Sequence, residues 1–318
     1  MNKLNKEEKA ALKGRRKRRR LKYIAILPSL VTLMNGFCGF VSILLASQGP
    51  DMVWRPWLLP RTNVSYFALA GYLIFLGMIA DVLDGHLARI SNSTSSFGAQ
   101  LDSLCDTITF GVAPAFLMLK LVQANARYFQ LVNNQPAALS GRVVFLIAIL
   151  YVMCAIIRLA RFNVETTAED THLSFVGLPS PPAAGTIVSL VVFQQDLLPK
   201  ITNWPEQFIN ASEFAAVWAL PIITLMAAIL MVTRIPYPHV VNRILRGKKQ
   251  FSTFLLVVFT ILLIIWNIQL AMALGFCVFV VYGLVQWLIT RITRSIRKGG
   301  KTETLQPSDP GPRTPNPD

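Results

Sequence analysis

Four aspartates lie within one stretch, DVLDGHLARISNSTSSFGAQLDSLCD (81–106), which is flanked on both sides by uncharged apolar segments. Asp81 and Asp84 are three residues apart and Asp102 and Asp106 are four apart, so each pair shares one face of a helix. The polar residues between the two pairs predict a turn that returns the chain antiparallel. Four carboxylates that converge in this way repel one another, and Arg89 alone cannot neutralise them. The spacing therefore predicts a site for divalent cations.

The chemistry of this site follows from its all-oxygen donors. Such donors favour Mg²⁺ or Mn²⁺, with Ca²⁺ as a third option. A carboxylate site whose metal ion has open coordination positions usually binds the phosphate groups of a substrate through that metal ion. Gly85 and Ala88 share the face of Asp81 and Asp84, and their small size lets a bulky group approach the helix. Small-residue helix packing is the alternative for Gly85 and Ala88, but it does not account for the aspartates.

The elements that carry these residues are membrane helices. Hydrophobic residues make up 53% of the 318-residue chain and charged residues only 15%, and apolar runs long enough to cross a bilayer recur along it. We therefore predict an all-α polytopic membrane protein with about eight transmembrane helices. Their approximate ranges are 23–47, 64–88, 99–122, 142–161, 179–195, 213–233, 251–268 and 270–291.

The distribution of Lys and Arg predicts the orientation of these helices. With eight spans, 25 of the 31 basic residues lie on the side that carries both termini, which predicts cytoplasmic termini. Asp81 comes 16 residues after Ser65, about 24 Å along a helix, so the acidic cluster lies just below the cytoplasmic headgroups of a core roughly 30 Å thick. We expect a multi-pass protein of the cell (inner) membrane with its site facing the cytoplasm.

The net charge of +15 does not indicate nucleic-acid binding, because the basic run RRKRRR stands directly before the first span. It acts either as a topology anchor or as a binding site for anionic membrane lipids. The four cysteines have no paired spacing and predict neither a disulfide framework nor a zinc site. We expect a basic cytoplasmic tail (1–22), catalytic helices (23–195), additional transmembrane helices (196–298) and a disordered cytoplasmic tail (299–318).

The order D-x2-D-G-x2-A-R-x8-G-x3-D-x3-D resembles the signature of the CDP-alcohol phosphatidyltransferase family. Members of this family are membrane enzymes that displace CMP from a CDP-linked lipid with two divalent ions. The resemblance implies that Asp81, Asp84, Asp102 and Asp106 bind Mg²⁺ or Mn²⁺ and that Asp106 is also the catalytic base. It further implies a CDP-lipid-binding set of Thr32, Asn35, Asp84, Gly85, Ala88, Arg89 and Gly98.

Other segments resemble the branch of the family that uses serine as acceptor, the phosphatidylserine synthases. They are LPSLVTLMNGFCG (27–39), LDSLCDTITFGVAPA (101–115), RLARFNVE (158–165) and FVGLPSPPAAG (175–185). This resemblance implies CDP-diacylglycerol and L-serine as substrates, phosphatidylserine as product, and a homodimer. A family member that uses glycerol 3-phosphate or an inositol-type acceptor is the nearest alternative. A cation transporter is remote, because it would need acids spread through the membrane depth.

The acceptor side of the site is less defined by the sequence. Arg158 and Arg161 are three residues apart at the cytoplasmic end of the fourth span, where they are either positive-inside anchors or an anion site. As an anion site they would bind the carboxylate of serine or the phosphate of the lipid. Asn163 and Ser180 are further candidates for contact with serine, and the GLPSPP segment (177–182) is expected to form a rigid turn that closes the pocket.

Overall fold

The structure is a computed structural model, and it describes most of the apolar part of the chain. The described residues are 28–49, 53–54, 64–91, 96–125, 137–167, 175–200, 205–233, 235–237 and 251–302. The basic tail 1–22 and residues 303–318 lie outside them, and so does the polar turn at 92–95.

Each of the eight predicted spans coincides with a helical segment of the described chain. α3 continues through a π-helical stretch, η1, into α4, and α7 continues through η2 and η3. The segments are Pro28–Ser47 (here the first helix), α2 Tyr66–Ser91, α3 Ser96–Asp106 with η1 Thr107–Val112 and α4 Ala113–Ala124, α6 Ala137–Thr167, α7 Ser180–Val192 with η2 Phe193–Leu197 and η3 Leu198–Lys200, α8 Glu206–Val232, α10 Phe251–Trp266 and α11 Ile268–Thr302.

Five helices within the described residues are long and apolar enough to cross a membrane, and Val217–Val232 is a shorter apolar helix. The predicted class, an all-α polytopic membrane protein, is therefore confirmed, while the number of eight spans and the side of the termini stay predictions. Two short antiparallel strand pairs, which the sequence did not indicate, join loops of the bundle. They are β1 (Val53–Trp54) with β2 (Val64–Ser65), and β3 (Phe175–Val176) with β4 (Pro236–Tyr237).

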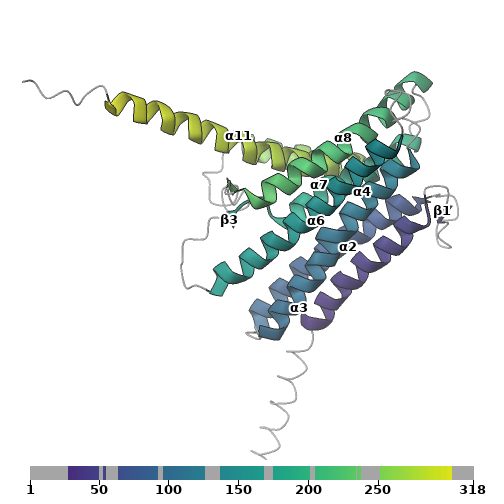
Figure 1. Cartoon of the computed structure of the whole chain (residues 1–318), viewed down its shortest axis with the longest axis horizontal. Helices are drawn as coiled ribbons and strands as arrows, with labels where there is room; N and C mark the ends of the chain where they lie inside the picture. Colours follow the sequence, from purple (N-terminus) through teal and green to yellow (C-terminus); the bar gives the residue numbers. More distant parts are fainter. Residues whose placement is uncertain are drawn as a thin grey trace, which may run out of the picture.

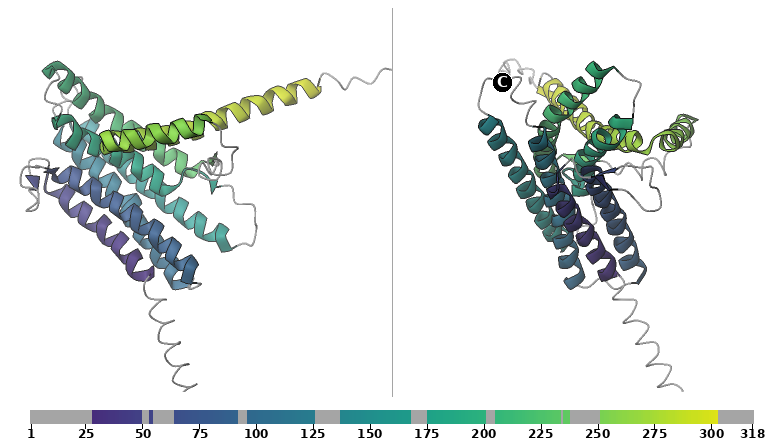
Figure 2. Two further views of the ribbon diagram at one scale, coloured as in Figure 1. Left: turned by 180° about the vertical axis from the view of Figure 1, so that it is seen from behind. Right: turned by 90° about the vertical axis from the view of Figure 1, so that its right-hand side faces the viewer.

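The first helix, α2, α3–α4, α6, α7 and α8 run side by side as one bundle (Figure 1). α7 contacts α2, α4, α8 and α11, so it lies at the centre of the packing. α11 crosses the bundle obliquely, and its C-terminal part projects beyond the other helices (Figure 2). Within the bundle, α3 and the C-terminal part of α6 lie toward the same end (Figure 1).

Glycines let three of the bundle helices approach one another closely. A Cβ atom at Gly36 would lie 2.8 Å from Cys105 Sγ, and one at Gly39 would lie 2.7 Å from the Cα atom of Thr109. On α2, a Cβ at Gly77 would lie 2.7 Å from the Thr109 methyl group. The first helix and α2 are thus packed directly against the segment that carries the second pair of aspartates.

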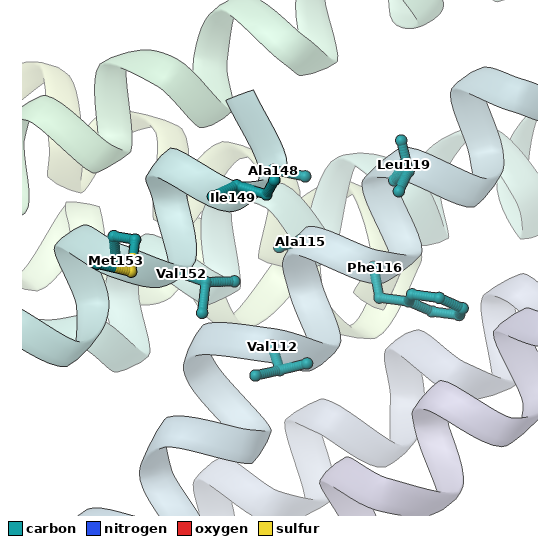
Figure 3. A pocket seen from close by; sticks show the side chains of 8 residues that line it. All are labelled: Val112, Ala115, Phe116, Leu119, Ala148, Ile149, Val152 and Met153. Carbon is teal, nitrogen blue, oxygen red and sulfur yellow. The ribbon is translucent and has the colours of Figure 1, made fainter. Parts of the chain in front are cut away.

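A shallow apolar groove of about 220 Å³ lies between α4 and α6 (Figure 3). Val112, Ala115, Phe116 and Leu119 line one side of it, and Ala148, Ile149, Val152 and Met153 line the other. Because every lining side chain is apolar, the groove cannot bind a metal ion or a phosphate group. The polar chemistry of the bundle is located elsewhere.

A polar cluster around the buried carboxylate of Asp196 ties α2, η2 and α11 together. Asp196, only 4% exposed, accepts hydrogen bonds from the Tyr72 hydroxyl and the Gln269 amide, each at 2.7 Å. Lys200 forms an ion pair with the same carboxylate at 2.7 Å. Tyr72 precedes Asp81 by nine residues on α2, about 14 Å along the helix axis. The cluster therefore lies well away from the aspartate stretch and fixes α11 to the bundle.

Replacing Asp196 tests this interpretation. Asp196→Ala removes the acceptor of the partly buried Tyr72 hydroxyl and leaves the Gln269 amide with its longer contact of 3.1 Å to that hydroxyl. We expect this change to cost about 1–3 kcal/mol of unfolding free energy. Lys200→Ala is the control and should cost less, because the lysine side chain is 51% exposed and its ion pair is screened by solvent. Thermal unfolding of the purified protein in detergent measures both. An Asp196→Ala protein that melts with the wild type would contradict a stabilising role for the cluster.

Candidate metal and CDP-lipid site

The structure brings together aspartates from two helices. One carboxylate oxygen from each of Asp81 on α2 and Asp102 and Asp106 on α3 lies within 4.8 Å of the others. Asp84 falls outside this closest group, but it interacts electrostatically with all three of these carboxylates. The antiparallel arrangement predicted from the spacing thus places all four aspartates at one location.

The donor atoms of this cluster fit a hard divalent cation. Oδ2 of Asp84 and Oδ1 of Asp102 are buried and have no hydrogen-bond donor within the described residues. Leaving buried carboxylate oxygens unpaired is costly, and a cation removes that cost together with the repulsion among the four charges. Oxygen donors without sulfur or nitrogen are the ligand set that Mg²⁺ and Mn²⁺ prefer. The four aspartates are therefore suited to hold such ions.

The first helix supplies two polar side chains to the cluster. Asn35 is fully buried, and its Nδ2 donates a hydrogen bond of 2.9 Å to Oδ1 of Asp106. Thr109 Oγ1 donates to the backbone carbonyl of Asn35 at 2.9 Å, which locks the asparagine in place. Thr32 donates to the Pro28 carbonyl at 3.0 Å, and its hydroxyl lies beside the Asp84 carboxylate. Thr32 and Asn35, two of the residues that the resemblance assigned to the CDP-lipid, thus contact aspartates directly.

The other residues assigned to the CDP-lipid lie at the same ends of α2 and α3. Among the described residues, a Cβ atom at Gly85 would meet no atom within 4 Å, so this face of α2 adjoins open space there. Ala88 and Gly98 are half-buried, whereas Arg89 is exposed and donates from Nε to the Gly85 carbonyl at 3.0 Å. A glycine next to open space beside four carboxylates leaves room for a phosphate group. That these residues bind the CDP-lipid stays a prediction.

The acceptor candidates come from α6 and the start of α7. Arg158 Nη1 donates a hydrogen bond of 2.6 Å to Ser180 Oγ, and the guanidinium interacts electrostatically with Asp106. Asn163 lies further along α6 and donates from Nδ2 to Ser103 Oγ at 2.7 Å. Arg161 is half-buried on the same helix. The structure therefore places Arg158 and Ser180 together near Asp106, and Asn163 against α3.

The turn before α7 is held by the end of α8. Gly177 adopts φ +96°, a left-handed conformation that favours glycine, and its N–H donates to the Ile235 carbonyl at 2.9 Å. Leu178 N–H donates to the Leu230 carbonyl at 3.0 Å, and a Cβ atom at Gly177 would lie 2.7 Å from the carbonyl oxygen of Met231. Residues beyond 195 thus fix the turn that positions Ser180.

Three residues near the site were missed by the sequence reading. Ser103 contacts Asn163, Thr109 holds Asn35, and the Tyr151 hydroxyl donates to the Phe110 carbonyl at 3.0 Å inside the π-helical stretch. Their partners are 41 to 74 residues away in the chain. The only sequence signal was local, since Ser103 and Thr109 lie on the segment that carries Asp102 and Asp106.

A bundle of membrane helices with converging aspartates in this motif defines a membrane-embedded transferase of CDP-linked alcohols. The family model described as CDP-alcohol phosphatidyltransferase matches residues 25–218, and the chain belongs to this family. The match ends within α8, before Leu230 and Met231, whose carbonyl groups lie against the turn at Gly177. The family generally depends on divalent metal ions, and the aspartate cluster is present in this chain.

Several relatives are similar over much of the chain. A CDP-diacylglycerol–serine O-phosphatidyltransferase of Helicobacter pylori (strain ATCC 700392 / 26695) is 30% identical over 268 residues, which are 84% of this chain and 93% of the relative. A protein of the same name from Methanocaldococcus jannaschii is 27% identical over 70% of this chain and 79% of its own. Another, from Saccharomyces cerevisiae, is 32% identical over 50% of this chain and 51% of its own.

Removal and return of metal test the aspartate cluster without measuring activity. Mn²⁺ added to EDTA-treated protein should raise the melting temperature, because the ion relieves the repulsion among the buried carboxylates. Asp102→Asn should reduce this rise, whereas the control Asp196→Asn, at the other cluster, should retain it. Equal increments in wild type and Asp102→Asn would exclude Asp102 as a ligand.

Proposed function

We propose that this membrane enzyme transfers the phosphatidyl group from CDP-diacylglycerol to the hydroxyl of L-serine, which releases CMP and forms phosphatidylserine. The convergence of Asp81, Asp102 and Asp106 within 4.8 Å, inside the family motif, carries the proposal for the chemistry. The acceptor rests on the names of the relatives, each of which is called a serine O-phosphatidyltransferase.

Two divalent cations, Mg²⁺ or Mn²⁺, held by Asp81, Asp84, Asp102 and Asp106 would neutralise charge on the phosphoryl oxygens and on the departing CMP. Gly85 and Ala88 leave room for the diphosphate beside α2, and Thr32, Arg89 and Gly98 lie around the same helix ends. The acyl chains would remain in the bilayer that surrounds the exposed apolar surface of the bundle. We place the protein in the cell (inner) membrane, with this site at the cytoplasmic face.

Asp106 is the general base in this proposal. Its carboxylate takes the proton of the serine hydroxyl as the serine oxygen forms a bond to the phosphorus that carries diacylglycerol. The bond between that phosphorus and the oxygen of CMP breaks, and CMP leaves with the bonding electrons. Asn35 Nδ2, 2.9 Å from Asp106 Oδ1, fixes the orientation of the base. Asn35 thus acts as a positioning residue.

Arg158 supplies the positive charge on the acceptor side. Its guanidinium is oriented by Ser180 and interacts with Asp106, so an anion bound there lies close to the base. Arg158 and Arg161 together would bind the carboxylate of serine or the phosphate of the lipid. A glycerol 3-phosphate or inositol phosphate acceptor would need a denser group of cations. We further propose a homodimer, on the family resemblance alone.

The acceptor is tested with the purified full-length chain, CDP-diacylglycerol and Mn²⁺ or Mg²⁺. CMP release is followed with serine, glycerol 3-phosphate and inositol phosphate, each added separately. We expect serine to give the fastest release. Release that does not depend on serine, or a preference for glycerol 3-phosphate, would reject serine as the acceptor.

Asp106→Asn should abolish turnover, because the amide cannot accept the proton but retains the size of the side chain. A general base contributes typically 10²–10⁴-fold to rate, so a fall of at least about a hundredfold in kcat is expected. Melting in detergent should show that the variant still folds. Near-native turnover in a folded Asp106→Asn protein would exclude Asp106 as the base.

The stereochemistry at phosphorus distinguishes direct transfer from a covalent intermediate. Direct attack by serine in a ternary complex predicts inversion of configuration when a chiral phosphorothioate analogue of the lipid is the donor. Retention of configuration, together with a trapped phosphatidyl-enzyme, would instead require two displacements and an enzyme nucleophile.

A further inference from the structure

Ser103 and Asn163 form a polar pair between α3 and α6 that the proposed reaction leaves unused. Asn163 Nδ2 donates to Ser103 Oγ at 2.7 Å, and Asn163 Oδ1 lies 3.2 Å from the same hydroxyl. The Ser103 hydroxyl is also 3.1 Å from the Ala99 carbonyl of its own helix, which can accept its hydrogen. Both side chains are half-buried, so each retains some exposed surface.

The position of this pair relates it to the reacting groups. Ser103 follows Asp102 directly and precedes Asp106 by three residues, about 4.5 Å along α3. On α6, Asn163 comes five residues after Arg158, about 7.5 Å along the axis. Arg158 on α6 interacts electrostatically with Asp106. Because Asn163 on the same helix contacts Ser103, this part of α6 faces the segment that carries the second pair of aspartates.

The three groups differ in charge, and so do the three functional groups of serine. The hydroxyl of serine must reach Asp106, and its carboxylate matches the guanidinium of Arg158. An ammonium group bound directly to the aspartates would compete with the metal ions for their oxygens. Neutral oxygen acceptors one helical turn away can bind it without that competition, and the negative field of the four carboxylates favours a cation there.

We infer that the Ser103–Asn163 pair binds the ammonium group of the acceptor and selects an amino alcohol. This inference rests on the proposed function, since it concerns the acceptor of that same reaction. The oxygen atoms Asn163 Oδ1 and Ser103 Oγ accept hydrogen bonds from the ammonium. The alternative role for the pair is a clamp that only holds α3 against α6.

Two analogues of serine separate these roles. 3-Hydroxypropionate is serine without its amino group, and ethanolamine is serine without its carboxylate. The full-length protein is assayed for CMP release with CDP-diacylglycerol, Mn²⁺ and each of the three acceptors. Where an analogue reacts too slowly, its competitive inhibition of the serine reaction gives the same comparison.

Ser103→Ala and Asn163→Leu should lower kcat/KM for serine and ethanolamine by about tenfold or more, the loss expected for a hydrogen bond to a charged group. 3-Hydroxypropionate should be little affected, so the preference for serine over this analogue should fall by the same factor. Asn163→Asp should preserve serine use and disfavour 3-hydroxypropionate further, because its added charge attracts ammonium and repels the carboxylate.

Thr224→Val is the matched control, because it removes a buried hydroxyl that donates to the Leu220 carbonyl of its own helix. It should leave the ratios among the three acceptors unchanged. Proportional losses for all three acceptors in Ser103→Ala and Asn163→Leu would overturn the inference. That result would instead support a pair that only holds α3 against α6. Failure of the proposed function is a different result, namely wild-type protein that shows no serine-dependent CMP release.

Discussion

The mutual repulsion of four carboxylates at the ends of two membrane helices is the constraint on which the structure depends. Carboxylate oxygens of Asp81, Asp102 and Asp106 lie within 4.8 Å of one another, and Asp84 adds a fourth negative charge. The guanidinium of Arg158 interacts with Asp106 and offsets part of this charge. Desolvated like charges at this distance are stable only when protons or cations neutralise part of the charge, and the oxygen donors of this cluster suit divalent cations. The same constraint agrees with the general dependence of the family on divalent metal ions.

Close helix packing makes this convergence possible. Gly36, Gly39 and Gly77 bring the first helix and α2 against Cys105 and Thr109, so that Asn35 reaches Asp106. A larger residue at any of these positions would force the helices apart. The π-helical stretch directly after Asp106 widens the turn of the helix at the site, a feature that often accompanies function.

The C-terminal half supports the site from a distance. The end of α8 holds the Gly177 turn, and this turn places Ser180 beneath Arg158. At the other polar cluster, Asp196 joins α11 to α2 through Tyr72 and Gln269. Residues outside the aspartate motif therefore fix the position of Ser180, which we propose for the acceptor side of the site.

The sequence by itself determined the membrane class, the positions of the eight helical segments and the facing of the aspartates. These properties are local, since a run of apolar residues and a spacing of three or four residues set them without reference to the rest of the chain. Tertiary structure alone decided that Asn35 holds Asp106, that Ser103 meets Asn163 and that Arg158 meets Ser180, across separations of 71, 60 and 22 residues. Such contacts depend on how the helices rotate and cross, which small residues and buried polar groups fix only when all the helices pack together.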